Sequence, residues 1–186
     1  MIKRYWAMPN KNTFKIKPIQ KYLINLLLNN PNATIVDPFV GEGSLYKEAY
    51  KVGFRGNVIC NDLNTNIKID LNNINLYHLD ALDFLKQLKS NYADIVMYDP
   101  PYSPRQVSEC YHNFGKKVTM ETTQSSWRRK HLDEIARITK PKKTCISFGW
   151  NSNGVGIKRK FHQKDILLIA HGGSHNDTIM TVEQKE

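Results

Sequence analysis

Short apolar runs alternate with longer amphipathic stretches along the chain, a pattern typical of strands alternating with helices. Five of these runs predict buried strands, at residues 34–37, 56–62, 76–80, 94–98 and 144–148. Pro18 suits the first turn of a helix, and the apolar spacing after it predicts that helix to about Leu28. A second helix is expected at residues 44–51. Parallel strands joined through helices are the expected core of the fold.

The C-terminal region carries a different pattern, with two apolar runs at residues 166–170 and 178–182 and only residues 171–177 between them. This connection has no room for a crossover helix, so the two runs are expected to pair as an antiparallel hairpin. His171 and His175 lie in the connection. With no cysteine or third histidine nearby, we interpret them as loop residues and expect no metal site.

The turn after the first predicted strand contains two glycines. Gly41 and Gly43 permit a tight turn and a close approach of a ligand to the backbone. The turn leads from a strand directly into the helix at Ser44, which is the context of a nucleotide-binding turn. The third glycine of a dinucleotide fingerprint would fall at the position of Tyr46, so a ligand with no phosphate at the turn is favoured.

Four of the predicted strands end in an acidic residue: Asp37, Asp62, Asp80 and Asp99. Each of these could be a simple turn or cap residue. In an open parallel sheet, however, such ends line one crevice, where ligands bind. Asp62 has the spacing of an acid that bonds ribose hydroxyls, and Asp80 could accept from an amino group such as adenine N6.

The tetrapeptide Asp99-Pro100-Pro101-Tyr102 follows the fourth of these strands. Two prolines remove backbone N–H groups and stiffen the chain, which leaves a carboxylate, carbonyl oxygens and one aromatic face at the end of the strand. This is a suitable receptor for a planar base with an exocyclic amino group, with Asp99 and the Pro100 carbonyl as acceptors and Tyr102 stacked on the ring. An ordinary proline-rich turn is the alternative.

Basic and aromatic residues are interleaved in the polar stretch 103–126, which shows no clear period and is interpreted as a substrate-recognition loop. Its aromatic residues Tyr111 and Phe114 could equally serve the loop's own packing. The next helix is predicted from Trp127 to about Thr139, capped by Ser125 or Ser126 and stopped by Pro141. It carries basic residues in its first turn, where the helix dipole disfavours cations. Either an anion docks there or the face is simply solvated.

The charge balance points to a polyanionic partner. Lys and Arg number 27 against 17 Asp and Glu, a formal net charge of +10, which favours nucleic acid over a merely solvated basic surface. Three separated cysteines indicate a reducing compartment, and Cys60 and Cys145 are expected in the core. No run is long enough to span a membrane and no secretory signal is recognised, so a single cytoplasmic domain, residues 1–186, is expected.

Two motifs together carry a family resemblance. Asp37-Pro38-Phe39-x-Gly41-x-Gly43 and Asp99-Pro100-Pro101-Tyr102 resemble the class I S-adenosylmethionine-dependent amino-methyltransferases, above all the DNA N6-adenine enzymes of phage and bacterial orphan type. The resemblance covers residues 7–183 and implies an α/β Rossmann-like domain with a seven-stranded, mostly parallel sheet and a C-terminal antiparallel hairpin. Within the N-terminal arm and helix, residues 1–30, the segment around Lys11–Pro18 occupies the place of the family's additional cofactor motif and matches it loosely.

The resemblance also implies site residues. The S-adenosylmethionine site would comprise Lys11, Phe14, Asp37, Pro38, Phe39, Gly41, Gly43, Asp62, Asp80, Ala81 and Asp99. The catalytic residues would be Asp99, Pro100, Pro101 and Tyr102. Tyr102 would contact the substrate base. The basic and aromatic residues of the predicted loop and of the next helix's first turn predict further substrate contacts, at Arg105, Tyr111, Lys116, Lys117, Arg128 and Arg129.

The implied reaction is direct methyl transfer to N6 of a flipped adenine in duplex DNA. Some RNA base methyltransferases share the tetrapeptide, so an adenine or guanine amino group in RNA is an alternative, as is cytosine N4. A protein methyltransferase fits less well because position 99 is Asp rather than Asn. A cofactor-less nucleic-acid-binding subunit is the non-enzymatic alternative. Only residues 103–143 separate Tyr102 from the fifth strand, so a short target sequence, a homodimer or a partner subunit is expected.

Overall fold

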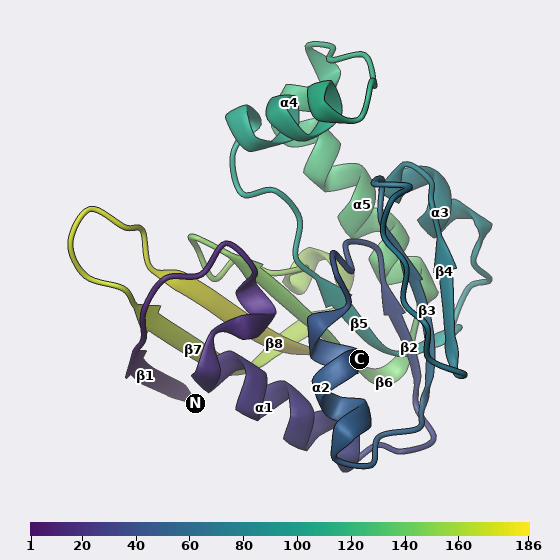
Figure 1. The fold of residues 1–186 in the computed structure, drawn as a ribbon, viewed down its shortest axis with the longest axis vertical. Helices are drawn as coiled ribbons and strands as arrows, with labels where there is room; N and C mark the ends of the chain where they lie inside the picture. Colours follow the sequence, from purple (N-terminus) through teal and green to yellow (C-terminus); the bar gives the residue numbers. More distant parts are fainter.

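The computed structural model describes residues 1–122 and 124–186 with their side chains. Over these residues the strands form one eight-stranded sheet in the order β1-β7-β8-β6-β5-β2-β3-β4 (Figure 1). The strands are β1 (Ile2–Trp6), β2 (Thr34–Asp37), β3 (Asn57–Asn61), β4 (Ile74–Tyr77), β5 (Ala93–Tyr98), β6 (Thr139–Gly149), β7 (Phe161–Ala170) and β8 (Thr178–Lys185). Only β8 runs antiparallel to its neighbours, β6 and β7. The structure confirms the mostly parallel α/β fold with a C-terminal hairpin.

The helices are α1 (Lys17–Leu28), α2 (Ser44–Lys51), α3 (Ala81–Gln87), α4 (Pro104–Asn113) and α5 (Ser125–Ile138), with short 3-10 turns η1 (Thr13–Lys15), η2 (Glu121–Thr123) and η3 (Ile157–Arg159). Four helices cover the two faces of the sheet, α1 and α2 on one and α3 and α5 on the other, whereas α4 stands out beyond the strand ends (Figure 1). A hydrophobic core lies on each face of the sheet. Alternate residues of β5 belong to the two cores, because successive side chains of a strand point to opposite faces. Ile95 and Met97 pack with α1 and α2, whereas Val96 and Tyr98 pack with α3 and α5. None of the described helices is long and apolar enough to cross a membrane.

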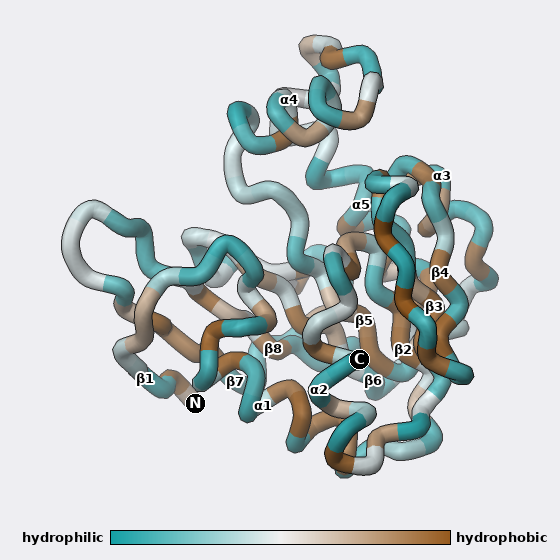
Figure 2. Tube along the Cα trace, viewed as in Figure 1, coloured by the Kyte–Doolittle hydropathy of each residue, from teal (hydrophilic) through white to brown (hydrophobic). Residues whose placement is uncertain are grey.

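The hydropathy of the chain follows these layers, with brown apolar stretches along the central strands and in α1 (Figure 2). Cys60 and Cys145 are buried, as expected. The strands β2 and β5 are buried almost throughout, which explains why their short apolar runs are recognisable in the sequence.

The sheet has one strand more than the seven expected. Residues 2–6, expected to be part of an extended arm, form β1, which pairs in parallel with β7 from Ile2 opposite Ile166 to Trp6 opposite Ala170. Four of its five residues are exposed. An edge strand that is solvated on both faces has no period-two pattern, so the sequence carries no signal for it.

The expectation of an irregular loop at 103–126 is wrong for its first half, which forms α4. Ser103 and Gln106 make a capping box, and Pro104 occupies the first turn. Val107 and Tyr111 lie one turn apart and are both buried. The signature Ser-Pro-x-Gln is present in the sequence and marks this helix start.

Three predicted boundaries also shift. The helix α5 begins at Ser125, so neither Ser125 nor Ser126 caps it by a side chain. Pro141 does not simply stop the helix but lies within β6, where the register against β5 shifts, and proline is tolerated at such irregularities. The strand β4 ends at Tyr77, ahead of the predicted end at Asp80.

A buried carboxylate fastens the loop after β6 to β8. The side chain of Glu183 accepts from the backbone N–H groups of Val155 (2.6 Å) and Gly156 (3.0 Å). Gly154 approaches this carboxylate so closely that a Cβ there would lie 2.1 Å from Glu183 Oε2, and its φ is +57°.

A Gly154→Ala variant is expected to lose roughly 2 kcal/mol of unfolding free energy, because positive φ and the clash act together. Urea denaturation would measure the loss. Gly115→Ala is the matched control, since Gly115 has a φ of +66° and open space around its Cβ position. Equal losses in the two variants would show that the clash with Glu183 costs nothing.

Candidate active site

A main cleft of about 710 Å³ opens at the carboxyl ends of the central parallel strands. Residues 99–102, which follow β5, form one wall. The turn between β7 and β8 forms another, and residues 9–13 of the N-terminal segment lie between them. The neighbouring strands β2 and β5 run parallel, so their ends and the residues that follow them meet at this edge.

Asp99 is partly exposed at this cleft and held by hydroxyl groups. Its Oδ1 accepts from the Tyr102 hydroxyl at 2.6 Å, and the Thr13 hydroxyl lies 3.1 Å from that of Tyr102. Desolvation raises the pKa of Asp99 to about 6, although hydrogen bonds from Tyr102 and Thr13 lower it. The carboxylate is therefore an ionised acceptor at neutral pH, poised near the pH at which it takes up a proton.

The tyrosine of the tetrapeptide has two partners of its own. Its backbone N–H donates to Gln106 Oε1 at 2.7 Å, and its ring packs edge-on against Trp150 with centroids 5.9 Å apart. The predicted catalytic residues Asp99, Pro100, Pro101 and Tyr102 all line the main cleft. Thr13, Gln106 and Trp150 line it too, and the sequence reasoning missed them. Trp150 follows the end of β6, so the strand-end rule applied to Asp99 would have found it.

The glycine turn between β2 and α2 is tied to Asp62. Asp62 accepts from the N–H of Gly41 (2.9 Å) and of Asn64 (2.8 Å). Gly43 has a φ of +66°, and a Cβ there would lie 2.5 Å from Ile69. Gly41 instead has open space beside it and lines a turn cleft of about 280 Å³ together with Lys11, Phe14, Phe39 and Asp99. Four predicted cofactor residues therefore meet Asp99 at this turn.

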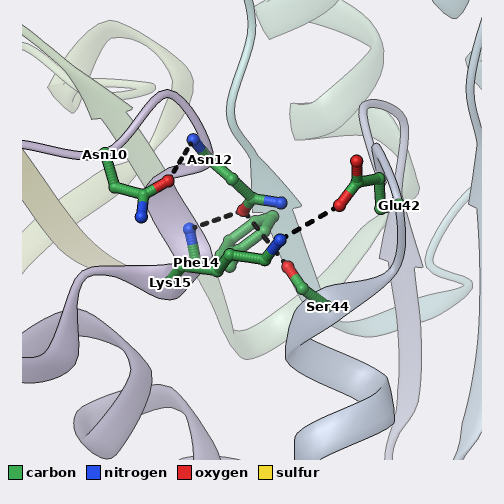
Figure 3. A network of polar contacts seen from close by, with 6 residues as sticks. All are labelled: Asn10, Asn12, Phe14, Lys15, Glu42 and Ser44. Carbon is green, nitrogen blue, oxygen red and sulfur yellow. Dashed lines mark hydrogen bonds and ion pairs between the residues drawn. The ribbon is translucent and has the colours of Figure 1, made fainter.

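The N-terminal segment is fastened across this turn (Figure 3). Asn12 Oδ1 accepts from the Phe14 N–H (3.1 Å) and from the Ser44 hydroxyl (3.2 Å), and Lys15 pairs with Glu42 at 3.1 Å. Phe14 is also a core residue, edge-on to Phe148. These contacts make residues 10–15 a fixed wall of the site.

The side chain of Asp37 is enclosed, so any contact of this residue with a cofactor would be made by its backbone. Its carboxyl oxygens accept from the Phe39 N–H (3.1 Å) and the Tyr46 hydroxyl (2.9 Å), and the residue has no exposed surface. Desolvation raises the pKa of Asp37 to about 7, and the charges of Asp99 and Asp62 add to the rise. Tyr46, at the position of the missing third glycine, is thus the partner of this buried carboxyl.

Asp80 is likewise occupied. It caps α3 by accepting from the Leu82 N–H (3.0 Å), and its other oxygen accepts from the Tyr111 hydroxyl. Trp127 Nε1 donates to the same hydroxyl at 3.0 Å. Tyr111 is buried by these contacts, which contradicts its predicted role in binding substrate. Tyr111 lines a small pocket of about 50 Å³ together with five of the predicted cofactor residues, Pro38, Phe39, Asp62, Asp80 and Ala81.

The basic residues predicted to contact substrate do not line the main cleft, but Arg128 lies close to it. One of its guanidinium nitrogens is 3.8 Å from the position that a Cβ of Gly149 would occupy, next to the cleft-lining Trp150. Among the described residues that line the main cleft, none of Arg105, Lys116, Lys117, Arg128 and Arg129 appears. Arg105 is paired with Glu109 at 2.7 Å, and the Arg128 guanidinium lies 5.5 Å from the ring centroid of Tyr98. Lys11, by contrast, does line the cleft.

His171 has a structural role that its interpretation as a loop residue missed. It is buried, its Nδ1 lies 2.8 Å from the Ala7 carbonyl oxygen and its Nε2 lies 2.8 Å from the Thr178 hydroxyl. It therefore ties the N-terminal segment to the hairpin. His175, Ser174 and Asn176 line the cleft beyond it.

Solved structures share the fold of this chain at low sequence identity. The N-methyltransferase NodS from Bradyrhizobium japonicum WM9 superposes with a TM-score of 0.64 at 10% identity, over 95% of this chain and 99% of that chain. The precorrin-6y C5,15-methyltransferase from Geobacter metallireducens GS-15 gives 0.63 at 12%, over 96% and 95%. TrmN from Thermus thermophilus gives 0.63 at 15%, over 92% of this chain and 49% of that chain.

The chain has a Rossmann-like methyltransferase fold. Neither a protein-family model nor a curated protein matches the sequence. NodS was also solved with S-adenosyl-l-homocysteine bound. At these identities the likeness concerns the fold, and the chemistry of the site rests on the residues of this chain.

Proposed function

We propose that this chain is an S-adenosylmethionine-dependent methyltransferase that modifies the exocyclic amino group of a nucleic-acid base, with adenine N6 in DNA as the first candidate. The observation that carries the proposal is Asp99, a partly exposed carboxylate at the end of β5, held by Tyr102 and followed by two prolines. Its place beside the glycine turn, where both line the turn cleft, supports a cofactor and a substrate meeting there.

The residues present fit a cationic cofactor. Asp37, Asp62 and Asp99 surround the glycine turn, and burial raises the pKa of each of them. A positive charge in the cleft would stabilise their ionised forms. Gly41, Phe39 and Lys11 would hold the cofactor at the turn cleft, and when bound it would supply an electrophilic methyl group on a sulfonium.

The residues of this chain would act by positioning the amino group of the substrate. An amino group offers two N–H donors, and the backbone at Pro100 and Pro101 has no N–H to compete for the acceptors there. Asp99 and the Pro100 carbonyl oxygen would take these donors and hold the nitrogen lone pair towards the cofactor. With its pKa near 6, Asp99 can accept the proton that the nitrogen loses.

The net charge of +10 supports a nucleic acid as the substrate. The chain supplies only α4, η2 and α5 between Tyr102 and β6, so we also propose that target recognition uses a second copy or a partner subunit.

The proposal is tested by incubating the protein with methyl-labelled S-adenosylmethionine and duplex DNA, total RNA or a protein extract. Label recovered from DNA as N6-methyladenine is expected. Label as N4-methylcytosine or in RNA bases would move the substrate, and label in protein alone would overturn the nucleic-acid assignment. Cofactor binding without transfer to any of them would favour a binding subunit.

The carboxylates also predict pH-dependent binding. A sulfonium favours ionised Asp37 and Asp99, so its binding near neutral pH should release protons and be about tenfold tighter at pH 8 than at pH 6. Calorimetry in buffers of different ionisation enthalpy measures both quantities. S-adenosylhomocysteine is the control, since it lacks only the methyl and its charge. Identical pH profiles for the two ligands would contradict the prediction.

A further inference from the structure

A second depression, the edge groove, lies between β1 and the start of α1 and has a volume of about 590 Å³. The two elements lie side by side at the end of the sheet remote from α3 (Figure 1). Pro9 and Asn10 line both the edge groove and the main cleft. The groove and the cleft that holds Asp99 therefore lie on either side of these two residues.

Two large aromatic side chains of β1 lie open at this groove. Trp6 is 66% exposed and Tyr5 is 42% exposed, and both line it. The indole Nε1 of Trp6 lies 3.6 Å from the position that a Cβ of Gly172 would occupy, which places the ring beside the hairpin turn. An exposed indole of this kind, outside either core cluster, presents a flat face for stacking.

The opposite wall of the groove is basic. Lys15, Lys17 and Lys21 line it, and no acidic residue is among its described lining residues. Lys15 is paired with Glu42, whereas Lys17 and Lys21 form no ion pair with a described residue. Lys17 also begins α1, where the helix dipole disfavours a cation and an anion would offset it.

We propose that the edge groove binds the nucleic-acid strand next to the target base, with phosphates on Lys17 and Lys21 and one base stacked on Trp6. The inference rests on the proposed function and extends it, because the target base would reach the main cleft past Pro9 and Asn10. Lysines and exposed aromatic side chains in one groove are the combination by which proteins hold single strands without reading their sequence. The groove's lack of acids among its described lining residues makes a nucleic-acid strand a better occupant than a basic peptide or a second copy of this +10 chain.

Binding of a short fluorescein-labelled oligonucleotide, as single-stranded DNA and as RNA, followed by anisotropy without cofactor, tests the stacking contact. Trp6→Ala is expected to raise Kd about tenfold, and Trp6→Phe, which keeps a ring, by less than about threefold. Equal binding by Trp6→Ala and the wild type would overturn the assignment of Trp6.

The phosphate contacts are tested by the salt dependence of the same binding. The double variant Lys17→Ala/Lys21→Ala should reduce the slope of log K against log salt by roughly 1.4, about 0.7 for each phosphate that the protein no longer neutralises. Lys86→Ala/Lys89→Ala, the same charge change at exposed positions in and after α3, should leave the slope unchanged. Equal slopes in the two double variants would overturn the proposal. So would a wild-type protein that is dimeric and becomes monomeric in Trp6→Ala, because a second copy would then occupy the groove.

Methyl transfer distinguishes this inference from the function on which it rests. Groove variants with weakened binding and a raised KM at unchanged kcat support both. Binding that depends on the groove, in a protein that methylates nothing, would leave the groove assigned and overturn the function. Normal methylation and normal binding by every groove variant would keep the proposed function and overturn the assignment of the groove.

Discussion

An Asp99→Asn variant is expected to fold normally and to transfer methyl groups about 100- to 1000-fold more slowly than the wild type. The amide can still accept from the Tyr102 hydroxyl, so the wall of the cleft should persist. It has no charge to attract the substrate's N–H donors and cannot take up a proton. The measurement is kcat/KM for the best substrate found, with thermal unfolding as the check on the fold.

The comparison with Tyr102→Phe sharpens this result. Phe keeps the ring against Trp150 and loses only the hydroxyl that holds Asp99, so a smaller decrease, about tenfold, is expected. The wild-type rate should rise with pH through about 6 as Asp99 ionises, and this rise should be absent in Asp99→Asn. Near wild-type transfer by Asp99→Asn would remove the residue from the mechanism.

An Asp37→Asn variant is expected to be more stable than the wild type at pH 8, by roughly 4 kcal/mol, and by much less at pH 5. The folded-state pKa of Asp37 is raised to about 7, above the pKa of the same carboxyl in the unfolded chain. Between these two pKa values the unfolded chain is ionised and the folded protein is not, so the wild type loses stability as the pH rises. The amide can keep partners in Tyr46 and the Phe39 N–H. Urea denaturation of both proteins across pH 5–8 measures the difference.

Asp94 provides a control of opposite sign. Its carboxylate accepts from Lys140 and the Thr34 N–H and pairs with Lys143, which hold its pKa below the usual range. The ionised Asp94 adds to the free energy of unfolding at neutral pH, and this stabilisation is lost as the pH falls through the folded-state pKa. Asp94→Asn should therefore destabilise the protein at pH 8, by roughly 1 kcal/mol. A stabilised Asp94→Asn, or an Asp37→Asn whose effect is independent of pH, would contradict this electrostatic picture.

The sequence predicts those site residues that directly follow the end of a buried strand. The strand β2 is predicted to the residue and β5 within one, because both are short, apolar and bounded by turn residues. The meeting of the glycine turn with Asp99 then follows from parallel pairing. Trp150 obeys the same rule, and the capping box at Ser103 is readable, so these two are recoverable from the sequence.

Other features depend on contacts between distant residues. Asp80 and Tyr111 are 31 residues apart, and their hydrogen bond helps to bury Tyr111, which its position in the predicted loop did not indicate. The exposed strand β1 has no apolar alternation, and its place is set by the open edge of β7. Such pairings follow from the packing of the whole chain rather than from any local pattern.

The position of β1 has a consequence for the order in which the protein assembles. In the described sheet β1 pairs with β7, so residues 2–6, the first of these two strands to be synthesised, have no partner until residues 161–170 emerge from the ribosome. Contacts of such long sequence separation close slowly, because the intervening chain must order first. The wall formed by residues 9–13 is joined directly to this strand. Competence to bind a ligand is therefore expected to appear in the last phase of refolding, after the central strands have already gained protection from hydrogen exchange.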